Sequence, residues 1–241
     1  MNERRIQVVP LPVIAVLAIS IALQLWIASN RPPLPNAATD LPPPPPHQVL
    51  QIASFGDPAT LARILMLELQ SFDSKATNPV PYRNLDYGRL IGWLARIIEL
   101  DPTAQYPLHA ASRIYADVQD EARQRKMLEF VYVSFFNDPE RRWPWLAQAA
   151  AVAKHRLKDL PLALRYAMAI QKHATSEQVP LWAKQMQAFI LEDMNELETA
   201  RIMIGGFIAS GQVKEPGELR FLEDRLKEIE SRISKRISPP H

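Results

Sequence analysis

Apolar and polar residues follow one another along most of this chain with the spacing of amphipathic helices. From Gln48 onward, apolar residues recur at positions i, i+3, i+4 and i+7, and no convincing run alternates with a period of two. Asp57 followed by Pro58 is a typical helix start, and Asp86 can cap a further helix. The pattern predicts an all-α domain.

The first 30 residues have a different pattern. Residues 6–29 are a stretch of 24 residues without a charged side chain, and about 20 apolar residues suffice to cross a membrane. We therefore predict an uncleaved transmembrane anchor over residues 1–30. A cleaved signal peptide and a buried core helix are the alternatives; the apolar run is too long for the former, and Trp26 is bulky for its cleavage site.

Positive charges around this stretch predict its orientation. Arg4 and Arg5 precede it, whereas only Arg31 follows it before Arg63. Because cytoplasmic flanks carry the excess of Lys and Arg, the N-terminus is expected in the cytoplasm and the C-terminal domain in the periplasm. The sequence thus predicts a single-pass protein of the inner membrane. The opposite orientation, with a cytoplasm-facing domain that anchors a soluble complex, is an alternative.

A proline-rich segment separates the anchor from the helical domain. Residues 31–47 contain eight prolines, five of them consecutive at 42–46. Such a run favours an extended polyproline II rod, so we predict a stiff linker over 31–47 and a folded domain over 48–241. The alternative is a ligand for a groove that recognises proline-rich segments.

The helical domain contains a repeat of 37 residues. Asp101-Pro102 recurs as Asp138-Pro139, and Leu108 maps by the same shift to Trp145 and then to Trp182. Helix–turn–helix units of this length stack into solenoids because one unit cannot bury its apolar face alone. We therefore predict repeats at about 103–139, 140–176 and 177–213, with Trp145 and Trp182 in the core. A charged helix over about 215–237 would cap the last unit.

These positions resemble the tetratricopeptide repeat. In the first predicted unit, the family's pattern of bulky, small and aromatic residues with a closing proline matches Leu108, Ala111, Ser112, Tyr115, Met127, Val131, Ser134 and Pro139. The second and third units, which open at Trp145 and Trp182, lack the closing proline, and the period exceeds the usual 34 residues. The resemblance covers about 85–213 and implies a right-handed helix–turn–helix solenoid.

The resemblance also implies a binding surface, because the first helix of each unit lines the concave face of such arrays. Carried over by position, the expected partner-binding residues are Tyr106, His109, Arg113, Asp117, Trp143, Ala150 and Lys154. Independently, positions 106, 109, 113 and 117 form one stripe of a 3.6-period helix. In such a stripe Arg113 would pair with a carboxylate and Trp143 would supply apolar area. The alternative is that the stripe is only solvated.

Catalytic chemistry has little support in the sequence. Phosphate-binding, dinucleotide-binding, serine-hydrolase and zinc-protease motifs are missing, the chain has no cysteine, and its five histidines form no i, i+4 pair. We predict no catalytic residues, no metal and no cofactor. Glu192, Asp193 and Glu196 lie at a predicted turn, where solvation is expected. Gly205-Gly206 within a helical stretch indicates either a close helix approach or a hinge.

Charge argues against a nucleic-acid partner. The 241 residues carry a net charge of +2, and the part after residue 47 is nearly balanced. Basic clusters such as Lys154 to Arg156 are therefore interpreted as solvated faces. The sequence favours a non-enzymatic scaffold that binds a protein or peptide in a bacterial envelope complex. A peptidoglycan-active envelope hydrolase, or an accessory to one, is the alternative.

Overall fold

The computed structural model describes residues 10–29, 41–71 and 81–237, and its regular elements within those ranges are all helical, including 11 α-helices. The all-α prediction is confirmed for this part of the chain. The chain divides into two compact units, Met1–Thr39 and Asp40–His241.

The N-terminal unit contains one described helix, α1 (Leu11–Ser29), which has 19 residues and no charged side chain. Its large apolar side chains, such as Val16, Ile19 and Trp26, are exposed. Among the described residues, no helix has the length and apolar character needed to cross a membrane.

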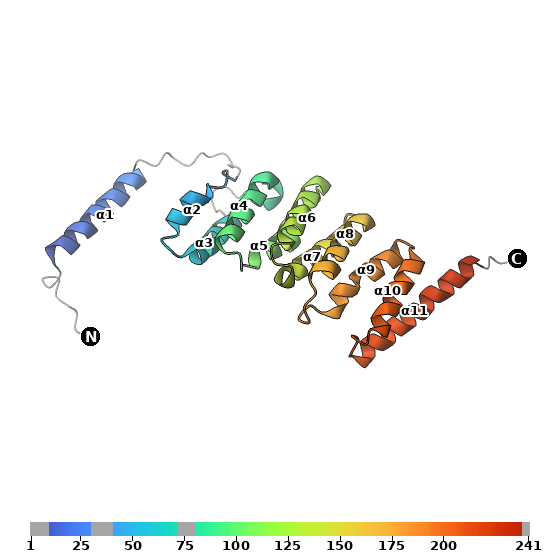
Figure 1. Ribbon diagram of the computed structural model, residues 1–241. Coiled ribbons are helices and arrows are strands. Elements are labelled where there is room, and N and C mark those ends of the chain that lie inside the picture. The colour runs from blue at the N-terminus through green and yellow to red at the C-terminus, as the bar shows by residue number, and fades with distance from the viewer. Residues whose placement is uncertain (1–9, 30–40, 72–80, 238–241) are drawn as a thin grey trace. The chain divides into compact units, whose positions relative to one another are not determined.

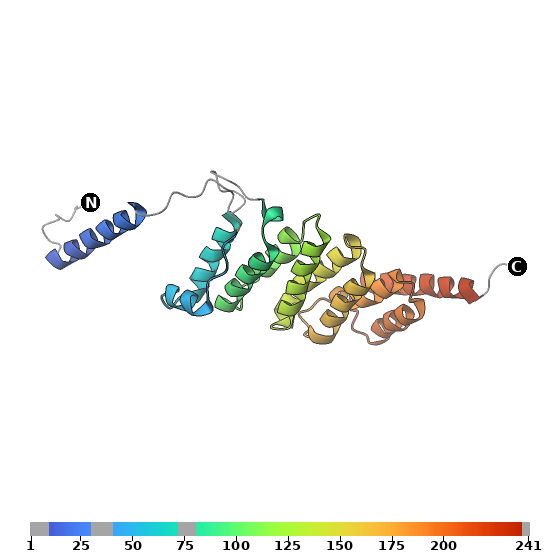
Figure 2. The same cartoon turned by 90° about the horizontal axis from the view of Figure 1, so that it is seen from above.

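The second unit is a row of helices that pack mainly against their neighbours in sequence (Figures 1 and 2). After α2 (His47–Ala53), the helices form four successive pairs and a final long helix. The first helices of the pairs are α3 (Pro58–Ser71), α5 (Tyr106–His109) continued by the π-helix η3 (Ala110–Tyr115), α7 (Pro139–His155) and α9 (Leu181–Asp193). The second helices are α4 (Tyr87–Leu100), α6 (Glu121–Phe135), α8 (Leu160–His173) and α10 (Leu197–Ala209), and α11 (Pro216–Ile237) follows. A short 3₁₀ turn, η2 (Tyr82–Asn84), precedes α4.

Acidic residues begin several of these helices as the sequence pattern predicts. The Asp57 carboxylate accepts a hydrogen bond from the Thr60 amide at 3.0 Å, and Asp86 accepts one from the Gly88 amide at 2.7 Å. Asp159 caps α8 in the same way. Each carboxylate satisfies amide groups that the first helical turn leaves without a partner, so the local sequence fixes where the helices start.

Each of the three predicted repeat ranges holds one pair of helices. The two Asp-Pro sequences, however, have different structural roles. Asp101 directly follows the last residue of α4, so Pro102 lies after a helix end. Asp138 instead occupies the N-cap position of α7, and Pro139 is the first residue of that helix. Proline is compatible with both places because neither needs its missing N–H.

Part of the predicted linker belongs to the helical array. Leu41 is only 1% exposed and lies in the main hydrophobic core, and the carbonyl of Pro42 accepts a hydrogen bond from the Trp93 indole of α4. The array therefore includes residues from Leu41 onward and starts before residue 48. The sequence pattern placed the boundary too late because a proline run gives no helical periodicity, although it can still pack against a helix. Residues 31–40 of the predicted linker lie outside the described residues.

Two packing expectations are wrong. Trp182 is 52% exposed and does not belong to the core, whereas Trp145 is half-buried against it. Gly205 and Gly206 lie in α10, and a Cβ atom built on either meets nothing within 4 Å. A close helix approach therefore does not explain this pair of glycines.

The last helix covers the end of the array, as expected for a cap. Leu222 and Ile229 of α11 are fully buried in a second hydrophobic cluster with residues of α9 and α10. Glu192 of α9 is 3% exposed and accepts hydrogen bonds from Arg225 at 2.7 Å and Arg232 at 2.6 Å. The solvation expected for Glu192 is thus wrong, because α11 folds back over it and supplies two guanidinium groups.

Candidate functional site

The predicted polar stripe lies on the first helices, and most of its members contact the neighbouring first helix. The hydroxyl of Tyr106 in α5 accepts a hydrogen bond from the amide of Gln70 in α3. Arg113 in η3 donates from Nε to the side-chain oxygen of Gln148 in α7 at 3.4 Å, a long bond from an exposed guanidinium. We call the surface that carries these residues the first-helix face.

Ion pairs continue the same pattern toward the C-terminus. Asp117, which follows η3, pairs with Arg156, which follows α7. Lys154 in α7 pairs with Asp193 at the end of α9. The interpretation of Lys154 to Arg156 as a purely solvated basic cluster therefore misses two contacts between successive pairs. Sequence spacing cannot reveal them because their partners come from other helices.

Ala150 does not belong to the first-helix face. Its side chain is fully buried in the main hydrophobic core, so no partner can reach it in this fold. The resemblance placed Ala150 at the repeat position equivalent to Arg113, which is exposed. The two positions do not face the same way, because η3 is a π-helix whereas α7 is α-helical. The position after it, Ala151, is partly exposed and lines a hollow beside Gln148.

Aromatic rings form a second feature of the first-helix face. The His109 ring lies 5.5 Å from the Tyr106 ring and 5.2 Å from the Trp145 ring, the latter edge-on. Farther along, Trp143 of α7 meets Trp182 of α9 edge-on at 5.4 Å. Such pairs are favourable in themselves, yet Trp182 keeps about half of its surface exposed. The repeat-related tryptophans thus differ: Trp145 packs against the core, whereas Trp182 is exposed and pairs with Trp143.

The π-helical backbone of η3 is held by side chains from two other elements, α4 and α6. The amide of Ala116 bonds the carbonyl of Ala111 at 3.0 Å, five residues back. The Tyr115 carbonyl accepts from the Tyr87 hydroxyl of α4 at 2.8 Å, and Gln124 of α6 donates to the Ala116 carbonyl at 2.7 Å. Burial raises the pKa of Tyr87 to about 12, so its hydroxyl remains a donor. π-Helical turns of this kind are frequent at functional sites.

A hollow of about 430 Å³ lies between η3 and α7. Arg113 and Asp117 line one wall, and Gln148 and Arg156 line the other. The remaining lining residues are Ser112, Ala116, Ala151, Val152 and His155. The hollow thus joins two exposed guanidinium groups and a carboxylate above a small apolar floor. It brings together Arg113 and Asp117 of the predicted stripe, whereas Trp143 lies outside its lining.

A second hollow adjoins the first. It measures about 660 Å³ and shares Asp117 and Arg156 with it, so their ion pair lies between the two. Arg83 and Arg123 line its other side, together with Asp120 and Glu121. In this second hollow Arg123 already pairs with Asp120.

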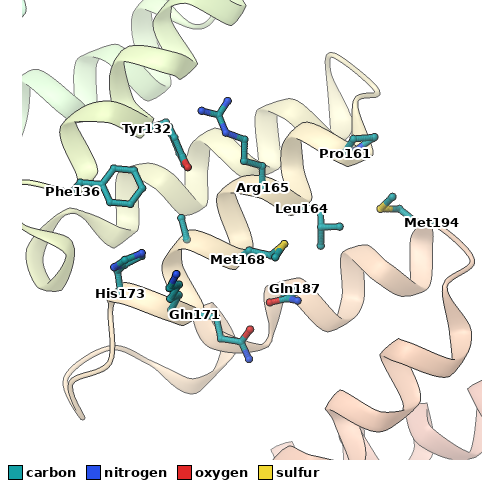
Figure 3. A pocket seen from close by; sticks show the side chains of 12 residues that line it. Tyr132, Phe136, Pro161, Leu164, Arg165, Met168, Gln171, His173, Gln187 and Met194 are labelled. Atoms are coloured by element: carbon teal, nitrogen blue, oxygen red, sulfur yellow. The ribbon is translucent and has the colours of Figure 1, made fainter.

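A further hollow, of about 800 Å³, lies on the second helices α6 and α8 and reaches α9 (Figure 3). Its lining is mainly apolar, with Leu164 and Met168 of α8 and Phe136 after α6. Arg165 stands over the Tyr132 ring at 4.0 Å and also bonds Glu129. The sequence analysis did not single out this feature, because aromatic residues that recur on a helix can face either the core or solvent. Only their partial exposure distinguishes them.

Four carboxyl groups in the described part of the chain have a pKa that is shifted from its usual value. These groups are Asp57, Asp86, Glu140 and Asp159, and the pKa of each is lowered. The main causes are hydrogen bonds donated by Thr60, Arg89, Ser176 and Leu162, respectively. A glycoside hydrolase needs the opposite shift in its general acid. Within the described ranges, no cluster of three or more His, Asp or Glu residues could hold a metal ion.

Comparison with known proteins gives no family model, no curated protein and no solved structure that matches this chain. The arrangement of the helices itself describes the fold: the second unit is an all-helical array whose helices pack mainly against their sequence neighbours.

Proposed function

We propose that this chain is a non-enzymatic scaffold, a tetratricopeptide-like solenoid that binds a segment of a partner protein on its first-helix face. The observation that carries the proposal is the hollow between η3 and α7, whose walls come from two successive helix pairs. Arrays of this kind present extended surfaces on which a few side chains anchor a ligand.

The side chains of this face favour a partner segment with an acidic and an apolar residue. Arg113 is exposed, and its bond to Gln148 at 3.4 Å is long enough to be replaced by a shorter bond to a carboxylate. Exposed Trp182 and partly buried Trp143 supply aromatic area on the next two first helices. Aromatic and arginine side chains commonly dominate the affinity of such surfaces.

We further propose that the chain is anchored in the inner membrane of a bacterium, with its N-terminus in the cytoplasm and the array in the periplasm. The support is the charge-free stretch over residues 6–29, the exposed apolar side chains of α1 and the two arginines at positions 4 and 5. The full chain should then resist extraction from membranes at alkaline pH, and deletion of residues 1–30 should release it. A reporter fused to the C-terminus should be active only outside the cytoplasm, and activity inside would contradict this orientation.

Charge reversal at the hollow tests the binding proposal. Arg113→Glu should remove captured partners when the full-length chain is isolated from membranes, because it opposes an acidic ligand while leaving the core intact. Lys126→Glu is the matched control, since Lys126 is exposed on the second helix α6 and away from the hollow. Partners that survive Arg113→Glu and are lost with Lys126→Glu would contradict the assignment of the face.

A further inference from the structure

The segment Leu41–Pro46 lies along α4 and is held by specific contacts. The guanidinium of Arg89 donates to the carbonyl of Leu41, and the indole N–H of Trp93 donates to the carbonyl of Pro42, both at 2.8 Å. The two donors are four residues apart, so they share one face of α4. Successive turns of the helix thus bind successive carbonyl groups of the segment, while the Leu41 side chain enters the core.

Gly92 allows the proline rings to approach the helix closely. A Cβ atom at this position would lie 2.8 Å from Cγ of Pro44, closer than side-chain atoms pack. Glycine in the interior of a helix is less stable than alanine. The close approach of Pro44 explains why glycine stands at this position. At the end of the segment Pro46 has φ −58° and ψ 145°, the conformation of polyproline II.

These contacts have the chemistry by which proteins recognise proline-rich ligands. In such sites an aromatic surface receives the proline rings of the ligand. Hydrogen-bond donors of the protein reach the ligand's carbonyl groups, which are free because a polyproline II helix forms no internal hydrogen bonds. We propose that Arg89, Gly92 and Trp93 form a binding site for leucine-led polyproline II segments. Leu41–Pro46 occupies it within the same chain, and a proline-rich segment of a partner protein competes for it.

The hydrogen bonds that hold the occupant allow a segment of the same shape to replace it. Both hydrogen bonds go to main-chain carbonyls, which any segment of the same shape presents. Pro42 and Pro43 are exposed, so this side of the segment lies at the surface of the unit. While the chain's own segment is docked, its high effective concentration weakens binding in trans. Weakening that segment should therefore reveal the site.

The test measures binding of a fluorescent peptide with the sequence of residues 40–47 to the full-length chain by anisotropy. Leu41→Ser combined with Pro44→Gly weakens the internal occupant and should tighten peptide binding by about tenfold or more relative to the unaltered chain. Adding Gly92→Ala should reverse the gain, because the new Cβ collides with the peptide's prolines. Gly206→Ala is the matched control, since a Cβ there meets open space in another helix, and it should leave the gain unchanged.

A second measurement covers the case in which the double variant does not fold. The chain has no cysteine, so Pro43→Cys places a single environment-sensitive dye on the exposed side of the segment. Unlabelled peptide should change its signal in a saturable way, and a peptide with serine in place of the leucine should not. Failure of the peptide to bind in either assay overturns the proposal. The unaltered chain should also be measured at high concentration. If it is dimeric there and the peptide makes it monomeric, a second copy of the chain and not a partner protein is the occupant.

Discussion

Arg142 is the residue whose burial has the clearest energetic consequence. Its side chain is 1% exposed, and its guanidinium donates to the carbonyl of Ser134 at 2.6 Å and to that of Pro102 at 2.9 Å. Burial lowers its pKa, which still leaves an arginine charged at neutral pH. One side chain of α7 therefore ties together the end of α6 and the turn after α4.

Removing this side chain should destabilise the array. Arg142→Ala leaves two inward carbonyl groups without a donor and creates a cavity, which should lower the free energy of unfolding by about 2–4 kcal/mol in urea denaturation. The neighbouring Arg141→Ala is the matched control, because Arg141 is exposed and pairs only with Asp138 at the helix start. A loss of about 1 kcal/mol or less is expected there. Equal losses in the two variants would contradict a structural role for Arg142.

The two repeat-related tryptophans should differ in the stability they provide. Trp145 packs against the core and donates its indole N–H to Gln105 at 2.8 Å, whereas Trp182 is 52% exposed. Trp145→Ala should therefore cost about 2–4 kcal/mol of unfolding free energy, and Trp182→Ala about 1 kcal/mol or less. Thermal or urea unfolding of both variants measures the difference. A larger loss for Trp182→Ala would contradict the exposure of its ring.

At the scale of elements, the cap helix α11 is held by charge as well as by apolar contact. Glu192→Gln removes the buried carboxylate that pairs with Arg225 and Arg232, and should lower the unfolding free energy by about 1–3 kcal/mol, since both guanidinium groups are partly exposed and can bind water. Proteolysis should then cleave α11 first, because it is the last element of the array. Glu196→Gln, at an exposed position before α10, should have little effect. Unchanged protection of α11 in Glu192→Gln would show that apolar contacts alone hold the cap.

Helices were predictable from the sequence where local chemistry decides them, and contacts between them were not. Asp57 and Asp86 cap helices as expected, because an N-cap depends on residues only two or three positions away. The burial of Ala150 and the exposure of Trp182 depend instead on the π-helical turn in η3 and on neighbouring pairs. The packing of Leu41–Pro46 on α4 connects residues about 50 positions apart and leaves no periodic signal in the sequence.

For the whole molecule, two surfaces compete as the place where a partner binds. The first-helix face offers the charged hollow between η3 and α7, and the second helices offer the larger apolar hollow of Figure 3. The proposed function assigns the partner to the first-helix face, where Arg113 is exposed and two helix pairs contribute. Size alone would favour the other hollow, so only a measurement of contact separates them.

Site-specific photo-crosslinking is the most direct test of that assignment. A photoreactive amino acid in place of Ala151, which lines the charged hollow, should yield an adduct with a partner in intact cells, and Arg113→Glu in the same chain should abolish it. The matched position is Val133, which is 60% exposed on α6 among the second helices and should yield no such adduct. An adduct that forms at position 133, and not at 151, would contradict binding on the first-helix face.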